Sequence, residues 1–177
     1  MLFTSRAKEI LIKNKDLLED LDKFYQSIPV SVSSEITSLF INSGINVLEN
    51  VSRIYPAMFA YTENFVNLKL PKNIKIIKQR AFLESKIKTV TIDKGCEHIQ
   101  AFAFARCHGL EKISIPTSVI KLDNSIFFEC ENLYQIEYQG TKQQWMDIDK
   151  SPRWNQGMPY SKIVCLDGTI EYLELQK

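Results

Sequence analysis

Four phenylalanines recur through the middle of the chain at nearly equal spacing, and this repeat constrains the fold more than any other feature. Intervals of 23, 22 and 23 residues separate them, and the residues after each one follow the same chemical pattern. They are Phe59, Phe82, Phe104 and Phe127. A unit of this length is too small to bury its own apolar face, so successive units must stack on one another. The repeat therefore predicts a solenoid with about 23 residues per coil.

Each copy also contains two apolar residues with one residue between them. These pairs are Leu68 and Leu70, Val90 and Ile92, Ile113 and Ile115, and Ile136 and Tyr138. Alternation with a period of two is typical of a strand with one buried face. Equivalent strands in stacked coils form a parallel sheet, with neighbours about 4.8 Å apart. We expect a degenerate fifth copy before the four clear ones, with Leu39, Ile41 and Ile45 matching Leu68, Leu70 and Ile74, and with a longer connection at 48–59.

The chain is thus predicted to be an α/β leucine-rich-repeat solenoid of four to five coils, in one folded domain. Residues 1–30 are expected to form an N-terminal helical cap, 31–138 the repeats, and 139–177 a C-terminal cap of a helix plus a β-hairpin. Caps are needed because each end of a solenoid exposes an apolar face.

The two ends carry the patterns that such caps require. A helical stripe runs through Ala7, Ile10, Leu11, Leu17, Leu18, Leu21, Phe24, Tyr25 and Ile28, and it is either a cap or a docking face for a partner helix. Asp16 to Glu19 has the form of a capping box, which favours a break into two helices near Asn14. At the other end, Thr141 to Gln144 is expected to begin a short helix that carries Trp145, and Asp167-Gly168 is expected to form a two-residue hairpin turn.

Cysteine and histidine occur close together twice, as Cys96 with His98 and as Cys107 with His108. The repeat columns explain the cysteines through packing. Cys107 and Cys130 share a small-residue column with Thr62 and Ser85, and Cys96 shares an apolar column with Ile74 and Val119. A zinc site needs four converging ligands. We therefore expect no metal and no cofactor, although oxidation in vitro could couple Cys107 to Cys130 on adjacent coils.

Composition limits the partners and the compartment. With 22 basic and 21 acidic residues the formal charge is +1, which gives no sign of nucleic-acid binding. No apolar run approaches the ~20 residues of a membrane span, and charged residues interrupt the region where a signal peptide needs an apolar core. Four cysteines without an export signal indicate reduced thiols. We expect a soluble cytoplasmic protein, or a virion protein if a phage encodes it.

Three segments resemble the BspA-like class of bacterial leucine-rich repeats. Residues 115–133 (IPTSVIKLDNSIFFECENL) and 69–87 (KLPKNIKIIKQRAFLESKI) are similar to the repeat of that class. Residues 138–170 are similar to the closing element that often follows its last repeat. The resemblance implies a protein-binding or adhesive scaffold and no enzyme. Consistent with this, the sequence contains no nucleophile motif, no glycine-rich phosphate loop and no HExxH.

The outward-facing columns are the candidate binding residues for an unidentified protein partner. Along the expected strand face these are Phe40, Lys69, Thr91, Ser114 and Glu137, with Lys112 and Tyr134 in the columns beside them. Such side chains suit a shallow contact with a protein or a glycan, or they form an ordinary solvated sheet face. Phe102 and Phe128 stand out as aromatic members of columns that are otherwise small, polar or aliphatic. They form either an exposed binding pair or a contact beneath a neighbouring loop or the terminal cap.

Three functions remain open at this point. The first is a non-enzymatic protein-interaction module. The second is a structural or decoration component of an assembly, which a phage could encode. The third is a Cys/His metal or redox site.

Overall fold

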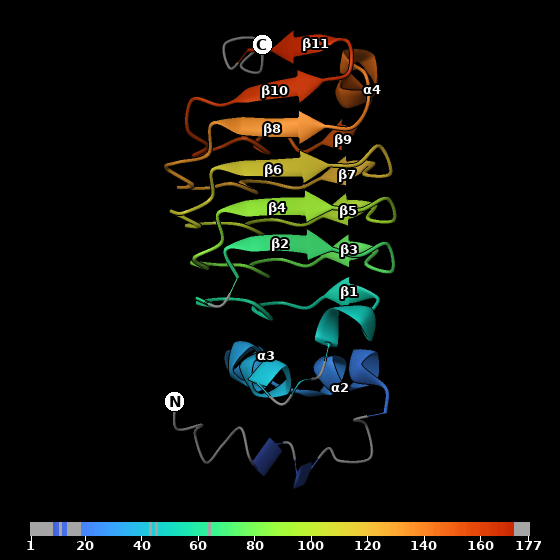
Figure 1. Cartoon of the computed structure of the whole chain (residues 1–177), viewed down its shortest axis with the longest axis vertical. Coiled ribbons are helices and arrows are strands. Elements are labelled where there is room, and N and C mark those ends of the chain that lie inside the picture. Colours follow the sequence, from blue (N-terminus) through green and yellow to red (C-terminus); the bar gives the residue numbers. More distant parts are fainter. Residues whose placement is uncertain are drawn as a thin grey trace.

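The computed structural model describes residues 9–10, 12–13, 19–42, 44, 46–63 and 65–171, and the statements below concern these residues. They form a solenoid, as predicted, and parallel strands run along two of its sides (Figure 1). Short helices lie at the N-terminal end, and a helix with a hairpin lies at the C-terminal end.

One side of the solenoid is a six-stranded sheet in the order β11-β10-β8-β6-β4-β2. All neighbours are parallel except the β10–β11 hairpin. We call the outward side of this sheet the strand face. Its strands are β2 (Asn67–Leu70), β4 (Thr89–Ile92), β6 (Lys112–Ile115), β8 (Gln135–Tyr138), β10 (Lys162–Cys165) and β11 (Gly168–Ile170).

A second, five-stranded parallel sheet lies on another side, in the order β1-β3-β5-β7-β9. Each of its strands is only two residues long, which is too short for an alternation pattern to be recognised in the sequence. The strands are β1 (Arg53–Ile54), β3 (Ile76–Ile77), β5 (His98–Ile99), β7 (Lys121–Leu122) and β9 (Asp149–Lys150).

The predicted phenylalanine column is confirmed. Phe59 and Phe82 stack with ring centroids 5.2 Å apart, Phe82 and Phe104 at 4.9 Å, and Phe104 and Phe127 at 5.8 Å, all nearly parallel. All four rings are almost completely buried. The apolar partners of each strand are buried in the same core, so like residues of successive coils form continuous internal rows.

The third side of each coil is a turn segment that we call the turn ladder, at residues 56–61, 79–84, 101–106 and 124–129. Backbone N–H groups of one coil donate to carbonyls of the next, as from Phe59 to Ala81 at 2.8 Å and from Phe82 to Ala103 at 2.8 Å. Two residues per coil have a left-handed backbone with φ between 53° and 58°. None of these eight is glycine: they are Ala57, Tyr61, Arg80, Glu84, Phe102, Arg106, Ser125 and Glu129.

The predicted strand at 39–41 is wrong, because these residues belong to a helix. The N-terminal elements are α2 (Leu21–Ser27), η2 (Val30–Val32), α3 (Ser33–Asn42) and η3 (Val47–Glu49). In α3 the buried residues Ser33, Ile36, Thr37 and Phe40 follow a helical period and not the alternation of a strand.

The first coil begins after residue 41, later in the chain than predicted, and its connection at 48–59 is no longer than in the other coils. Val47, Val51 and Ile54 are buried, and each lies 23 positions before its equivalent in the next coil, Leu70, Ile74 and Ile77. The pairing of Ile54 with Ile77 confirms this register. The segment 48–59 is therefore an ordinary part of the first coil and not the extended loop that we expected.

The N-terminal cap prediction is confirmed in part. Leu21, Phe24, Tyr25 and Ile28 of the predicted stripe are buried. The N-cap of α2 is Asp20, whose carboxylate accepts a hydrogen bond from the Lys23 N–H at 3.1 Å. Ala7, Leu11, Leu17, Leu18 and most of the expected capping box at 16–19 lie outside the described residues. The domain division at residues 30 and 138 stays a prediction.

At the C-terminal end the predicted helix is α4 (Lys142–Met146), with the expected capping box between Thr141 and Gln144. Trp145 and Trp154 are buried, and their rings meet edge to face at 5.6 Å. The hairpin turn is one residue earlier than predicted: Cys165 pairs with Gly168, so Leu166 and Asp167 form the loop. Within the described part of the chain, no helix has the length and apolar character needed to cross a bilayer.

Candidate protein-binding surfaces

The strand face carries four of the predicted residues in one row. Lys69 pairs in register with Thr91, Thr91 with Ser114, and Ser114 with Glu137. Because a parallel sheet spaces its strands about 4.8 Å apart, these side chains stand at regular intervals along the solenoid axis.

Most charged and amide groups of the strand face are already paired with one another. Lys112 contacts Glu137, Gln135 donates to Glu137 at 3.0 Å, and Lys69 lies 3.1 Å from Asp93. Exposed ion pairs of this kind contribute little stability, so a partner can replace them at low cost. Thr91 is exposed and its hydroxyl has no hydrogen-bond partner among the described residues, whereas Ser114 is partly buried and accepts a hydrogen bond from Gln139 at 3.1 Å.

One predicted member of this surface does not belong to it. Phe40 lies in α3, where its ring packs edge to face against Phe24 at 5.6 Å and is buried. The alternation that suggested a strand there was accidental, because the helical period of α3 determines which side chains reach the core. Phe40 is therefore corrected from a surface residue to a core residue.

Tyr134 is half-exposed where the chain enters β8, and a second tyrosine accompanies it. Tyr160, which is more exposed, precedes β10 on the neighbouring coil. The Lys162 N–H donates to the Tyr134 carbonyl at 3.1 Å, and Ser161 Oγ donates to the Leu133 carbonyl at 2.6 Å. Sequence reasoning missed Tyr160 because it lies in the C-terminal cap, outside the repeat columns. Two tyrosines thus border the strand face at this end.

Phe102 and Phe128 do form a pair, with ring centroids 6.0 Å apart and an edge-to-face angle of 72°. Both are partly buried. The Arg80 guanidinium lies 5.9 Å from the Phe102 ring, and Phe128 packs against Gly157, where an added Cβ would lie 2.4 Å from the ring. The pair is therefore partly covered by the cap and partly open, and its role in binding stays a prediction.

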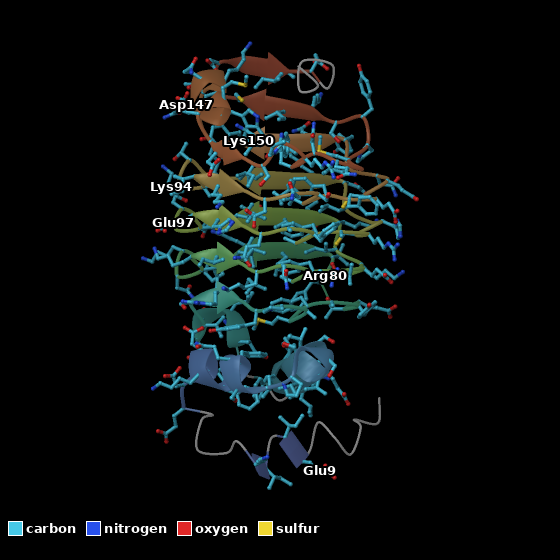
Figure 2. The ribbon with its side chains drawn as sticks, turned by 180° about the vertical axis from the view of Figure 1, so that it is seen from behind. Glu9, Arg80, Lys94, Glu97, Asp147 and Lys150 are labelled. Atoms are coloured by element: carbon cyan, nitrogen blue, oxygen red, sulfur yellow. The ribbon has the colours of Figure 1, made fainter. Side chains whose placement is uncertain are left out.

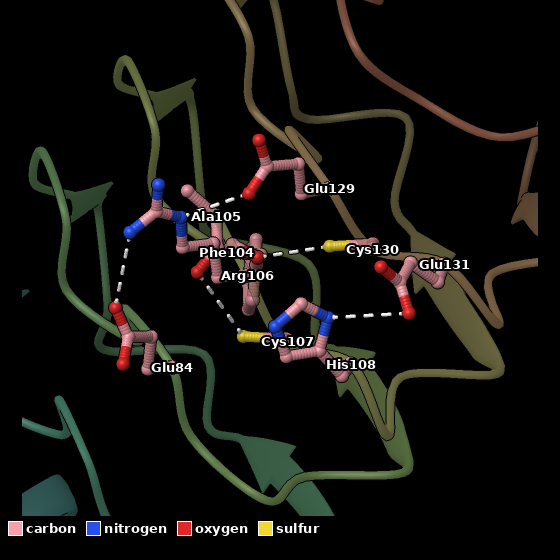
Figure 3. A network of polar contacts seen from close by, with 9 residues as sticks. All are labelled: Glu84, Phe104, Ala105, Arg106, Cys107, His108, Glu129, Cys130 and Glu131. Carbon is pink, nitrogen blue, oxygen red and sulfur yellow. Dashed lines mark hydrogen bonds and ion pairs between the residues drawn. The ribbon is translucent and has the colours of Figure 1, made fainter.

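The column interpretation of the cysteines is confirmed by burial and hydrogen bonds. Cys107 Sγ donates to the Phe82 carbonyl at 3.0 Å. Cys130 Sγ donates to the Phe104 carbonyl at 2.9 Å, as Figure 3 shows. Cys96 is buried in the core with Ile74 and Val119. Burial raises the pKa of the Cys96 thiol to about 12 and also raises the pKa of Cys165. The contact with Cys107, together with burial, raises the pKa of Cys130.

The two histidines are directed to different carboxylates. His98 Nε2 lies 3.0 Å from Asp123, and His108 Nδ1 lies 3.7 Å from Glu131, as Figure 3 shows for the second pair. In the part of the chain that the structure describes, no three His, Cys, Asp or Glu side chains are grouped so that they could hold a metal ion.

Charged residues on the turn ladder form a small axial network. Arg106 lies between Glu84 of the preceding coil at 3.5 Å and Glu129 of the following coil at 2.9 Å (Figure 3). The hydrogen bond to Glu129, followed by its charge, raises the pKa of Arg106. All three residues have the left-handed backbone of the ladder, so the network links positions that the repeat keeps in line.

Lys150 of β9 forms hydrogen bonds that link the second sheet to the C-terminal end of α4. In Figure 2, Asp147 and Lys150 lie at the C-terminal end of the solenoid, farther along it than Lys94 and Glu97. The Lys150 ammonium donates to the carbonyls of Trp145, of Met146 at 3.3 Å and of Ile148 at 3.1 Å. Burial lowers its pKa. Cations are favoured at a helix C-terminus, so this lysine has a structural role.

Comparison with known families agrees with this geometry. The family model described as BspA type leucine rich repeat region matches residues 32–147 in six copies. No curated protein has a matching sequence.

Two solved structures are similar to the chain. One is the pneumococcal vaccine antigen PcpA, with 25% identity and a TM-score of 0.43, covering 51% of this chain and 27% of that chain. The other is a leucine rich cell surface protein from Faecalibacterium prausnitzii, with 31% identity and a TM-score of 0.43, covering 56% of this chain and 33% of that chain. The matched part thus spans a third or less of either solved chain.

Proposed function

The chain belongs to the BspA-type leucine-rich repeat family, and from that premise we propose that it is a non-enzymatic module that binds a protein partner through its strand face. Leucine-rich repeats are commonly scaffolds for protein interaction, since a solenoid offers an extended and regular surface. The observation that carries the proposal is the row of Lys69, Thr91, Ser114 and Glu137, held in register across four strands.

The chemistry of the row favours a protein partner with mixed polar character. One end carries Lys69 and the other carries Glu137, with two hydroxyl side chains between them. Tyr134 and Tyr160 add exposed aromatic area beside the acidic end, and aromatic residues often dominate binding energy. A glycan contact uses the same hydroxyl and aromatic groups and is an alternative outcome of the test.

The test is affinity capture from the native host with matched variants. Thr91→Arg/Ser114→Arg places two bulky cations in the middle of the row and is expected to abolish capture of the partner. Glu97→Gln/Ile120→Arg adds the same net charge at exposed positions away from both the strand face and the turn ladder and should leave capture unchanged. Equal capture by both variants would refute the strand-face proposal.

The Phe102/Phe128 pair is the second candidate surface, supported by its partial exposure and by the Arg80 contact. Phe102→Ser introduces the residue that Ser125 already supplies in the same column, so the coil should still form. Loss of capture with this variant and not with Thr91→Arg/Ser114→Arg would move the binding site to the turn ladder.

A structural role in an assembly is the other candidate function. It is favoured by one observation, that β2 and β11 form the two ends of the six-stranded sheet. Stacking of sheet ends would produce linear self-association. Light scattering across a concentration series separates the two functions: growth of the particle with concentration supports assembly, and a constant monomer mass argues against self-assembly.

A further inference from the structure

The six-stranded sheet ends at β2, and we propose that the outer edge of β2 binds an extended segment of a partner protein as an additional parallel strand. The segment would carry apolar residues at alternate positions and polar or acidic residues between them. This inference deepens the proposed function by adding a second contact, but it concerns a different surface from the middle of the strand face.

The backbone of β2 offers hydrogen-bonding groups at this edge. Val66 and Leu70 turn their carbonyls toward β4, where they accept from Thr89 at 3.1 Å and from Asp93 at 3.0 Å. Alternate residues of a strand in a parallel sheet face opposite neighbours. Asn67 and Lys69 therefore turn their N–H and C=O groups to the outer edge, and none of the described residues hydrogen-bonds them there.

The corresponding end of the second sheet is closed by the N-terminal helices. The carboxylate of Asp22 in α2 accepts hydrogen bonds from the Ser52 N–H, next to β1, at 3.1 Å and 3.0 Å. The same carboxylate accepts from the Tyr55 hydroxyl at 2.9 Å. Natural proteins usually cover or interrupt exposed sheet edges because such edges pair with other chains. The contrast indicates that the edge of β2 is left available.

Two hollows lie near this edge, one lined mostly by apolar residues and one that includes Lys69 of β2. One, of about 150 Å³, is lined mainly by Ile41, Val47, Leu48, Phe59 and Phe65 and is apolar. An apolar cavity of roughly this volume can hold a benzene-sized group. The added strand can therefore place one apolar side chain inward, in continuation of the row that includes Leu68.

The second hollow, of about 260 Å³, lies on the polar side and is lined by residues that include Glu49, Lys69, Pro71 and Asp93. Lys69 is the nearest β2 side chain to an outward residue of the added strand. Lys69 lies 3.1 Å from Asp93 in this hollow, and an acidic residue of the added strand would replace that exposed partner at low cost. The two hollows share Asn46 and Leu48, so both lie against the same end of the sheet.

Continuity of the sheet supports a parallel strand as the occupant. Every neighbour from β2 to β10 pairs in parallel with one register per coil, and β2 is where this interface stops. A segment that pairs in parallel with β2, in the way that β2 pairs with β4, would extend the same sheet by one strand. Strand addition at an open edge is a known mode of peptide recognition, with backbone bonds giving affinity and alternate side chains giving specificity.

The test uses a labelled peptide, FVNLELP, which is the sequence of residues 65–71 with glutamate at the position of Lys69. In the proposed register its two leucine N–H groups face β2, and its asparagine and glutamate N–H groups face away. N-methylation of the two leucines should weaken binding at least tenfold in fluorescence anisotropy. N-methylation of the asparagine and glutamate should leave binding within a factor of about three. Equal affinities for the two methylated peptides, or no binding of the parent peptide, would overturn the proposal.

Amide hydrogen exchange supplies a second readout on the whole chain. In the free protein, the amides of Asn67 and Lys69 should exchange at least tenfold faster than those of Leu68 and Leu70, and the peptide should slow them. If Asn67 and Lys69 are already protected without peptide, the chain covers its own edge and the inference is wrong.

Variants of β2 separate this site from the strand face. Lys69→Pro removes an edge N–H, a change tolerated in edge strands, and should abolish peptide binding, whereas Lys69→Arg keeps both the N–H and the positive charge and should preserve it. Thr91→Arg/Ser114→Arg should abolish partner capture without changing peptide affinity, so failure of one proposal is distinguishable from failure of the other. If Lys69→Pro does not fold, the methylated peptides still decide the question.

Discussion

At the scale of single residues, the structure shows why unlike side chains occupy equivalent positions. Thr62, Ser85, Cys107 and Cys130 share one column because the site needs a small buried group that can donate a hydrogen bond. Thr62 donates to the Phe59 carbonyl at 2.8 Å, and the two thiols donate to carbonyls of the preceding coil. A hydroxyl and a thiol meet the same requirement, so the cysteines need no chemical role to be explained.

The burial of the phenylalanine column leads to a stability prediction that mutation can test. Phe104 is stacked between Phe82 and Phe127, so Phe104→Ala leaves a cavity with rings on both sides. We expect a loss of about 3–5 kcal/mol in the free energy of unfolding, measured by urea denaturation. Phe102→Ala, next to it but only partly buried, should cost less than about 2 kcal/mol. A similar loss in both variants would contradict the assigned burial.

Stability at alkaline pH should depend on Cys96. Burial holds its pKa at about 12 against an ordinary value of 9.0, so the unfolded thiol ionises first as the pH rises. The stability that this neutral thiol supports is complete below pH 9.0 and is lost progressively toward pH 12. The slope for one group is about 1.4 kcal/mol per pH unit.

Cys96→Val should flatten that slope, since the Val119 position of the same column already accepts valine. We expect its stability at pH 7 to lie within about 1.5 kcal/mol of the parent. Denaturation curves between pH 9 and pH 11 would show the difference. The same slope in both proteins would assign the alkaline loss to other groups, such as Tyr55, whose pKa burial also raises to about 12.

At the scale of secondary-structure elements, the strands that were predicted correctly are those in the periodic part of the sequence. The strands β2, β4, β6 and β8 and their register follow directly from apolar alternation and a constant coil length. The strands of the second sheet escaped prediction because two residues cannot display a period. The turn ladder was not predicted either. Glycine is the usual sequence sign of a left-handed backbone, and none of the eight left-handed residues of the ladder is glycine.

The error in the first coil has a different cause. Leu39, Phe40 and Ile41 satisfy a strand pattern locally, but the packing of Ile36 and Phe40 onto α2 selects a helix. Tertiary packing commonly overrides local propensity. Phe40 was misplaced because it lies outside the four regular copies, from which the other predicted surface residues derive.

One alanine of the turn ladder has a left-handed backbone, so replacing it with glycine should raise stability instead of lowering it. Ala57 has φ of 55°, a conformation that costs an L-residue roughly 1–2 kcal/mol. Ala57→Gly should therefore raise stability by about 0.5–1 kcal/mol, because strain relief exceeds the entropy cost of glycine. Ala101→Gly, a similarly buried turn-ladder alanine whose φ is not positive, should lower stability by about 0.5–1 kcal/mol. Melting temperatures of the two variants that shift in the same direction would contradict this account.

The C-terminal helix depends on its capping box. Thr141 Oγ1 accepts from the Gln144 N–H at 3.2 Å, and Gln144 Oε1 accepts from the Thr141 N–H at 2.9 Å. Thr141→Ala should destabilise the protein by about 1 kcal/mol, and Thr141→Ser should be nearly neutral. Thermal denaturation measures both. A neutral Thr141→Ala would show that Trp145 packing and Lys150 hold α4 without the cap.

At the scale of the whole molecule, the solenoid turns one repeated sequence pattern into three different sides. The strand face is polar and regular, the second sheet is narrow, and the turn ladder carries an ion-pair network beside a partly exposed aromatic pair. Binding is proposed on the strand face because its repeat strands are four residues long, so its outward rows lie on a broader surface than the two-residue strands of the second sheet provide. The same regularity leaves the edge of β2 as the natural place for an added strand.

Site-specific photo-crosslinking in the native host tests the strand-face claim most directly. A photoreactive amino acid at Ser114 stands in the middle of the row, and one at Lys121 stands on the second sheet of the same coil. The account predicts a discrete covalent adduct with one partner protein from position 114 and none from position 121. Equal adducts from both positions, or an adduct from position 121 alone, would contradict it.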